Sequence, residues 1–127
     1  KDFQQLSIIQ SHINKNKIQT KIIPCSTIRE KNGVAMSSRN SKLSENQMKY
    51  AERIYRFVKN NKKLILNKIL KKKRSHILKK LIELGASKVD YVECIDLVNK
   101  KIYKNSKLNF KVFIAYYLGD VRLIDNL

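Results

Sequence analysis

The sequence predicts a mixed fold, in which a short α/β part is followed by an α+β part made of helices and a small antiparallel sheet. Four observations support this fold class. Apolar residues recur with a helical period over the first 17 residues, and β-branched residues crowd the next ten. The helical period returns over residues 44–84, and beyond that segment the period changes to two. We therefore expect two units, with the junction in the loop Arg29–Leu43.

Length and composition narrow the class of protein. With 127 residues and 14.9 kDa, the chain fits one domain, or one small domain and part of another. Its 43% hydrophobic and 30% charged residues are too apolar for a disordered chain, and no apolar run approaches the roughly 20 residues that span a bilayer. Cys25 and Cys94 stand far apart without a CxxC pair, so we expect no disulfide and no zinc site. These features favour a cytoplasmic, globular protein with no membrane partner.

The formal net charge of +18 raises the question of nucleic-acid binding. However, Lys, Ile and Asn, which share A- and T-rich codons, make up 50 of the 127 residues. A base-composition bias would place such lysines on exposed surfaces without any polyanionic partner. The most basic stretch, Lys59–Lys80, also contains no aromatic residue on which a base could stack. We expect no specific nucleic-acid ligand, and a basic nucleic-acid-binding module stays an alternative.

Residues 1–17 predict a helix. Its apolar side chains have helical spacing: Phe3, Leu6, Ile9 and Ile13. The β-branched segment Ile18–Thr27 predicts a strand. A helix followed by a strand resembles the second half of a βαβ unit, whose first strand would precede Lys1. We therefore expect the chain to be truncated before Lys1.

The segment Arg29–Lys42 predicts a loop, because it loses periodicity and concentrates hydroxyl, amide and cationic side chains. This loop is the expected junction between the two units. Ser44 and Gln47 have the S-x-x-Q form of a capping box, in which the two side chains bind backbone amides at a helix start. We expect a long helical stretch from there, interrupted near Asn60 and Asn61.

A further turn and helix follow in the sequence. The basic run Lys71–Arg74 predicts the turn, and helical spacing returns over Ser75–Leu84. Gly85 is well placed to close that helix in a left-handed conformation, which favours glycine.

The remainder predicts strands. Both faces of the segment Val89–Ile95 are partly apolar, as in a strand that is covered on two sides. Phe110–Leu118 predicts a second strand, and Gly119 and Asp120 predict a hairpin turn into Val121–Ile124. A small antiparallel sheet should therefore follow the helical region.

Two segments combine groups that suit phosphates. The loop Gly33–Asn40 offers hydroxyls, backbone amides and an arginine, a combination that holds oxygen-rich anions. The start Lys1–Gln5 places a cation, a carboxylate and an amide at the head of a helix, whose N-terminus attracts phosphate. Composition alone leaves a structural interpretation open for each segment, as a helix-capping connector and as an ordinary helix start.

We expect no metal ligand and no acid–base catalyst among the other polar residues. His12 and His76 are isolated, each inside a predicted helix and without a second ligand nearby in sequence. Cys25 and Cys94 lie in strand-like apolar stretches, where a thiol usually packs as a small hydrophobic group.

Four segments together resemble the pantothenate synthetase family. They are KDFQQL at Lys1–Leu6, TIREKNGVAMSSRNSKLS at Thr27–Ser44, KVDYVECID at Lys88–Asp96 and RLIDN at Arg122–Asn126. The resemblance covers essentially the whole chain, and the first two segments carry most of it. It implies a Rossmann-like nucleotide-binding domain, similar to that of class I aminoacyl-tRNA synthetases, of which residues 1–41 would be the C-terminal part. Residues 42–127 would form the C-terminal lid domain.

The resemblance also implies an activity. Members of this family join (R)-pantoate to β-alanine with ATP and Mg2+, in the pathway to coenzyme A. The carboxylate of pantoate attacks the α-phosphate of ATP and releases pyrophosphate. The amine of β-alanine then displaces AMP from the resulting pantoyl adenylate.

The resemblance assigns roles at matching positions. The ATP-binding residues would be Lys1, Asp2, Ile28, Met36, Ser37, Ser38 and Arg39. Among them, Lys1 would contact a phosphate, Asp2 the ribose and the backbone of Ile28 the adenine. The last four match the family's counterpart of the KMSKS loop, which closes over the β- and γ-phosphates. Gln5 would bind pantoate.

The sequence departs from the family pattern in one respect. Family members carry an upstream H-x-G-H motif that stabilises the leaving phosphates, and no segment of this chain corresponds to it. We therefore expect no catalytic residue of that kind here and no ligase activity from the chain alone. Its partners would be the missing N-terminal half and, in the complete enzyme, a second copy in a homodimer. A decayed, non-catalytic remnant is a further alternative, against which the intact KDFQQ and MSSRN segments argue.

Overall fold

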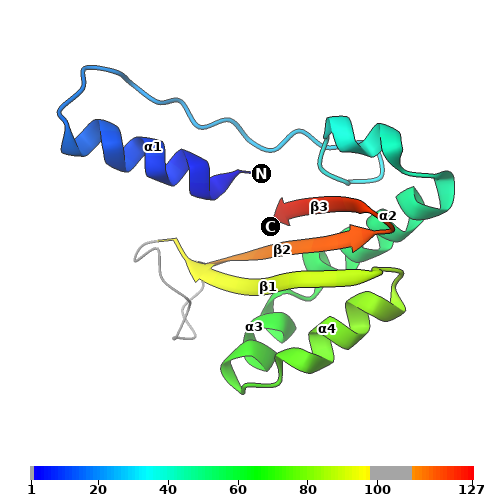
Figure 1. Ribbon diagram of the computed structural model, residues 1–127. Helices are drawn as coiled ribbons and strands as arrows, with labels where there is room; N and C mark the ends of the chain where they lie inside the picture. Colours follow the sequence, from blue (N-terminus) through cyan, green and yellow to red (C-terminus); the bar gives the residue numbers. More distant parts are fainter. Residues whose placement is uncertain (1, 98–109) are drawn as a thin grey trace.

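The computed structural model describes residues 2–97 and 110–127 (Figure 1). Its elements in chain order are α1 (Phe3–Lys15), the 3-10 helix η1 (Ser38–Lys42), α2 (Glu45–Asn60), α3 (Lys62–Leu70), α4 (Arg74–Glu83), β1 (Lys88–Asp96), β2 (Phe110–Leu118) and β3 (Val121–Asn126). The strands form one antiparallel sheet in the order β1-β2-β3. Helices α2, α3 and α4 cover one face of this sheet, and a long extended segment connects α1 to η1 (Figure 1).

The helical layer forms where local signals in the sequence predict it. Ser44 and Gln47 make both halves of the capping box: the Ser44 N–H donates to Gln47 Oε1 at 2.8 Å, and the Gln47 N–H donates to Ser44 Oγ at 3.3 Å. The predicted interruption is confirmed, because α2 ends at Asn60 and α3 begins at Lys62. Ile54, fully buried in α2, lies at the centre of the core that this layer shares with the sheet.

The end of α4 confirms the role predicted for Gly85. Its φ angle is +116°, and its N–H donates to the Ile82 carbonyl at 2.9 Å. The next N–H, that of Ala86, donates to the Leu81 carbonyl at 3.1 Å. These two bonds form a Schellman motif, which satisfies carbonyl groups left open at a helix end and turns the chain into β1.

The sheet presents two faces of different character. Alternate residues of β2, such as Ile114 and Leu118, point into the core with Val92 and Cys94 of β1. The opposite face of β1 is only half-buried, so the strand is fully covered on one side rather than on two. Asp90 has no partner in the register between β1 and β2 and forms a bulge there.

The strand predicted at Ile18–Thr27 is wrong. The segment is extended but belongs to no sheet, and the structure records β pairing only for β1, β2, β3 and one bridge between Arg29 and Ala35 within the described ranges. β-branched residues favour an extended backbone, but a strand also needs a neighbour whose amides and carbonyls complete its ladder. Cys25 is accordingly exposed, and the prediction that its thiol packs as a hydrophobic group is also wrong. The Rossmann-like domain stays a prediction.

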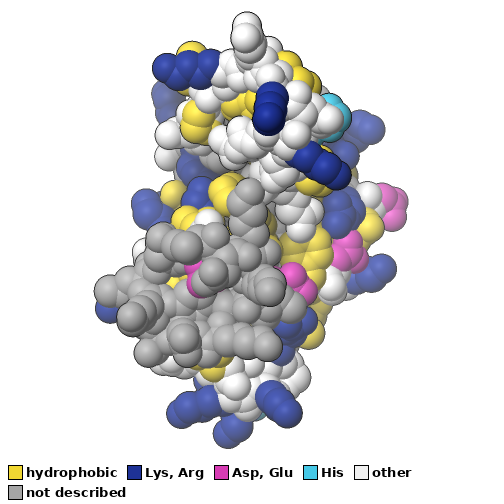
Figure 2. All heavy atoms as spheres, turned by 90° about the vertical axis from the view of Figure 1, so that its left-hand side faces the viewer, with side chains coloured by type: hydrophobic (Ala, Val, Ile, Leu, Met, Phe, Trp, Pro, Cys, Tyr) yellow, Lys and Arg dark blue, Asp and Glu magenta, His cyan; other side chains and the backbone are white. Residues whose placement is uncertain are grey.

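The basic side chains of the chain are not gathered at one end of the molecule (Figure 2). Figure 2 shows lysine and arginine side chains on the drawn face both near the α1 end and at the opposite end. Among residues 2–97 and 110–127, no helix has the length and apolar character needed to cross a membrane.

Candidate functional site

The loop between the extended segment and η1 contains a small hairpin, residues 28–36. The Met36 N–H donates to the Ile28 carbonyl at 3.0 Å, and the Glu30 N–H donates to the Val34 carbonyl at 2.8 Å. The Gly33 N–H closes the tip by donating to the Glu30 carbonyl at 2.8 Å. These bonds make the loop a defined unit rather than a free connector.

Glycine is required at the tip of this hairpin. Gly33 has a φ angle of +91°, and a Cβ atom there would overlap the Tyr55 ring of α2. The hairpin therefore sits directly on α2, and Val34 is buried in the core beneath it. Packing against α2 thus fixes the position of the hairpin relative to the sheet.

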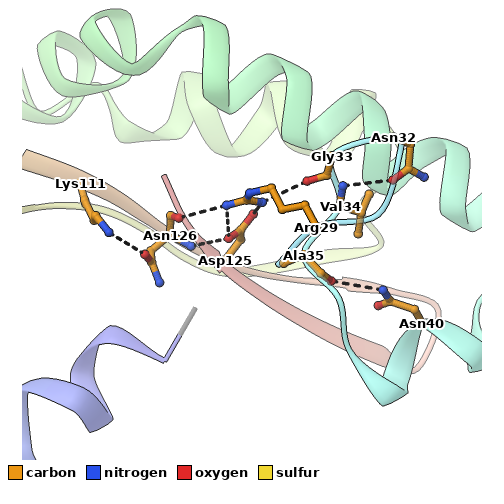
Figure 3. Close-up of polar contacts among 9 residues, drawn as sticks. All are labelled: Arg29, Asn32, Gly33, Val34, Ala35, Asn40, Lys111, Asp125 and Asn126. Atoms are coloured by element: carbon orange, nitrogen blue, oxygen red, sulfur yellow. Dashed lines mark hydrogen bonds and ion pairs between the residues drawn. The ribbon is translucent and has the colours of Figure 1, made fainter. Parts of the chain in front are cut away.

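Arg29 ties the hairpin to the last strand (Figure 3). Its Nη1 and Nη2 atoms donate to the two oxygens of Asp125 at 2.7 and 3.1 Å, a bidentate ion pair. Nη1 also donates to the Gly33 carbonyl at 3.0 Å, and the guanidinium lies 4.9 Å from the centroid of the Tyr55 ring. The hydrogen bonds to Asp125 raise the pKa of Arg29 above its ordinary value.

The residues of the loop that are predicted to bind phosphate, Met36 to Arg39, lie at the end of the hairpin and directly after it in the sequence. Ser37 Oγ accepts the Arg39 N–H at 3.2 Å and caps η1, whereas Met36, Ser38 and Arg39 are exposed. The Arg39 side chain reaches β3 through a 3.5 Å hydrogen bond from Nη1 to the Arg122 carbonyl. Asn40, buried behind them, donates to the Ala35 carbonyl at 3.2 Å and closes the loop on itself.

The start of α1 faces the open side of the sheet. The side chain of Asp2 makes no capping hydrogen bond to the helix. Asp2 and Gln5 line a cleft of about 490 Å³ together with Tyr91 of β1 and Phe113 of β2. The rings of Phe3 and Phe113 meet edge to face, with centroids 5.6 Å apart, and so seat the helix start on the sheet. Lys1 lies outside the described residues.

Strand β3 connects the two groups of predicted site residues. A smaller hollow of about 20 Å³ is lined by Ser37 and Arg39, and both hollows are also lined by Ile124 and Asp125. Ile28 lines neither of them, and its side chain is 72% exposed while its carbonyl holds Met36. The structure therefore brings Asp2 and Gln5 to one side of β3 and Ser37 and Arg39 to the other.

Comparison with known proteins assigns the chain to a family. A family model described as pantoate-beta-alanine ligase matches residues 1–127, the whole chain. The chain belongs to this family. A pantothenate synthetase of Flavobacterium psychrophilum is 37% identical over 131 residues, which cover 100% of this chain and 46% of that protein. A pantothenate synthetase of Clostridium acetobutylicum is 36% identical, covering 99% and 46%. The chain thus spans about half the length of the curated ligases it matches, corresponding to their C-terminal portion.

Solved structures of ligases of this family share the fold. A crystal structure from Francisella tularensis, described as pantoate-beta-alanine ligase complexed with beta-gamma ATP and beta-alanine, superposes with a TM-score of 0.67 at 33% identity. It is matched over 100% of this chain and 40% of that one. A pantothenate synthetase from Thermus thermophilus superposes with a TM-score of 0.74 at 24% identity, and the match covers 46% of its chain, which supports the fold.

Sequence reasoning missed the residues of the sheet that line the site. Asp125, Tyr91 and Phe113 were given no role, although Asp125 and Tyr91 belong to two of the four segments that resemble the ligase family. Tyr116 also lines the smaller hollow, and burial raises the pKa of its hydroxyl, with the charge of Asp125 adding to the effect. For Asp125 and Tyr91, membership in one of these segments was the only signal available, whereas Phe113 and Tyr116 belong to none of the four segments.

Proposed function

We propose that this chain is the C-terminal portion of an ATP-dependent ligase that joins (R)-pantoate to β-alanine, with ATP as a substrate together with Mg2+. One observation supports the proposal beyond family membership: the hollow beside Ser37 and Arg39 and the cleft beside Asp2 and Gln5 are both lined by Ile124 and Asp125. A nucleotide spanning β3 would contact both groups, with its phosphates at the loop and its ribose at the start of α1.

In the first step, a carboxylate oxygen of pantoate attacks the α-phosphorus of ATP, and the bond from that phosphorus to the pyrophosphate oxygen breaks. Negative charge accumulates on the leaving group, so fixed donors aimed at it lower the barrier. Arg39 and the Ser37 and Ser38 hydroxyls would supply such donors from this chain, and Met36 would help close the loop. Lys1 would contact a phosphate from the other side of the nucleotide.

The remaining roles concern binding. The Asp2 carboxylate would accept ribose hydroxyls, and the backbone at Ile28 would contact the adenine through its N–H or through the second lone pair of its carbonyl. Gln5 would bind pantoate in the larger cleft. In the second step, the β-alanine amine attacks the acyl carbon and loses a proton while AMP leaves. Positioning of the amine supplies most of this rate enhancement.

Pantoate-dependent exchange of pyrophosphate into ATP tests the proposal. The assay uses the complete polypeptide from its source, including any residues before Lys1, and we expect exchange there but none from residues 1–127 alone. Arg39→Ala should slow exchange about 100-fold, because one donor to developing charge contributes about 3 kcal/mol, with little change in pantoate binding. Arg56→Ala is the matched control, since Arg56 is exposed and pairs with Glu52 on α2. Unchanged exchange in Arg39→Ala would refute the role of the loop.

A further inference from the structure

The segment RLIDN is one of the four that resemble the ligase family, and the proposed reaction gives it no role. In the structure it is β3, and its Asp125 forms the bidentate pair with Arg29, 96 residues earlier in the chain. Arg29 belongs to the REKNG stretch that opens the phosphate loop. The pair therefore joins two of the four segments that resemble the ligase family and that are remote in sequence.

Arg29 and Asp125 each use two of their side-chain atoms to hydrogen-bond the other. Asp125 Oδ2 accepts Arg29 Nη1, while Oδ1 accepts Arg29 Nη2 and the Asn126 N–H at 2.8 Å. The same two nitrogens of Arg29 also donate to the carbonyls of Gly33 and Asn126, Nη1 at 3.0 Å and Nη2 at 3.4 Å. The Asp125 side chain is only 9% exposed and that of Arg29 only 23%. A carboxylate occupied in this way holds a neighbouring element in place and has little capacity left for a substrate.

The held element is the hairpin of residues 28–36. Its internal hydrogen bonds make it a defined unit that includes Arg29, and Gly33 packs closely on Tyr55. Ser37 and Arg39 follow its second arm directly, and the hydrogen bond that joins Arg39 to β3 is long, at 3.5 Å. Their position over β3 therefore depends on the Arg29–Asp125 pair.

We propose that Arg29 and Asp125 are a positioning pair, which locks the hairpin onto β3 and thereby places Ser37 and Arg39 for the triphosphate. This inference rests on the proposed ligase function. Neither partner acts on the reacting atoms. Their effect reaches the reaction through the loop, so it concerns ATP and the adenylation step rather than pantoate.

The test is a double-mutant cycle in the complete polypeptide, with Arg29→Ala, Asp125→Asn and the two combined. Each single variant should lower kcat/KM for ATP in the exchange assay about 10- to 100-fold, the scale expected when a donor is displaced by about 1 Å. The KM for pantoate should change less than about threefold. The double variant should be no worse than either single variant, because both remove the same interaction.

Two further variants separate positioning from folding. Arg29→Lys keeps the charge but loses the bidentate geometry, so it should be intermediate in activity and report even where Arg29→Ala folds poorly. Glu52→Gln breaks a carboxylate–arginine pair confined to α2 and should leave the kinetics unchanged.

The alternatives give different results. Two results would show that Asp125 contacts a substrate and would contradict the positioning pair. One is multiplicative losses in the double variant, and the other is a raised KM for pantoate in Asp125→Asn alone. Lower melting temperatures with unchanged kcat/KM for ATP would mean that the pair only stabilises the fold. That result would also overturn the proposal. An inactive wild-type polypeptide would refute the proposed function and the positioning role with it, whereas an active wild type with unaffected variants refutes the positioning role alone.

Discussion

The region from α2 to β3 and the region from α1 to residue 28 use similar apolar residues with opposite results. In the first, Ile54, Leu81 and Val92 have no exposed surface. In the second, no residue of α1 is buried, and Ile8 and Ile23 are 69% and 74% exposed. Apolar periodicity predicts the shape of an element, but burial requires a partner surface, and only the α2–β3 region supplies one within the described residues.

The largest expected effect is the contrast between a core and an α1 isoleucine. In the isolated chain, Ile54→Ala should lower the free energy of unfolding by about 2–5 kcal/mol, because it removes buried methyl groups and leaves a cavity. Ile8→Ala should change it by less than about 0.5 kcal/mol. Urea denaturation, with comparable m-values, measures both. Equal losses at the two positions would show that α1 packs on the sheet far more closely than its exposure indicates.

The same contrast explains which parts of the fold could be predicted. The capping box at Ser44, the Schellman end at Gly85 and the hairpin at Gly119 are local, so a few neighbouring residues determine each of them. The strand expected at Ile18–Thr27 failed because pairing is not local. A β-branched run predicts an extended backbone, and the ladder depends on residues elsewhere.

The candidate site divides in the same way. Asp2, Gln5, Ser37 and Arg39 could be named because they lie in short motifs with recognisable chemistry. The Arg29–Asp125 pair could not be predicted, since 28 cationic residues and ten acidic residues offer many pairings and none has a sequence signal at a separation of 96 residues. Only the folded hairpin selects this one.

A smaller effect locates the boundary between the two regions. Gly33→Ala and Gly119→Ala both place a side chain at positive φ, which costs each variant about 1–2 kcal/mol. At Gly33 the new Cβ would also overlap the Tyr55 ring, whereas at Gly119 its nearest neighbour would be Gln47 Nε2, at 3.0 Å. Gly33→Ala should therefore be less stable by a further 1–3 kcal/mol or so in urea denaturation. Similar losses in the two variants would mean that the hairpin separates from α2 at little cost in free energy. The well-packed region would then begin after the hairpin.

The smallest effect concerns the two cysteines, one in each region. Burial raises the pKa of the Cys94 thiol from 9.0 to about 12, with a small opposing effect of Arg74. At pH 8 a thiol reagent should modify the exposed Cys25 and leave Cys94 unmodified until the chain unfolds.

The raised pKa also predicts a dependence of stability on pH. Below pH 9 the thiol is neutral in both folded and unfolded chains, so the stabilising contribution is complete. Between pH 9 and 12 the unfolded chain loses this proton while the folded chain keeps it, and stability falls by at most about 1.4 kcal/mol per pH unit. Unfolding free energies at pH 8 and 10.5 should show this loss in the wild type and in Cys25→Ser, and less of it in Cys94→Ala. Identical dependences of the unfolding free energy on pH in all three chains would mean that water reaches Cys94. The core would then be less well shielded from water than the contrast between its buried residues and the exposed residues of α1 indicates.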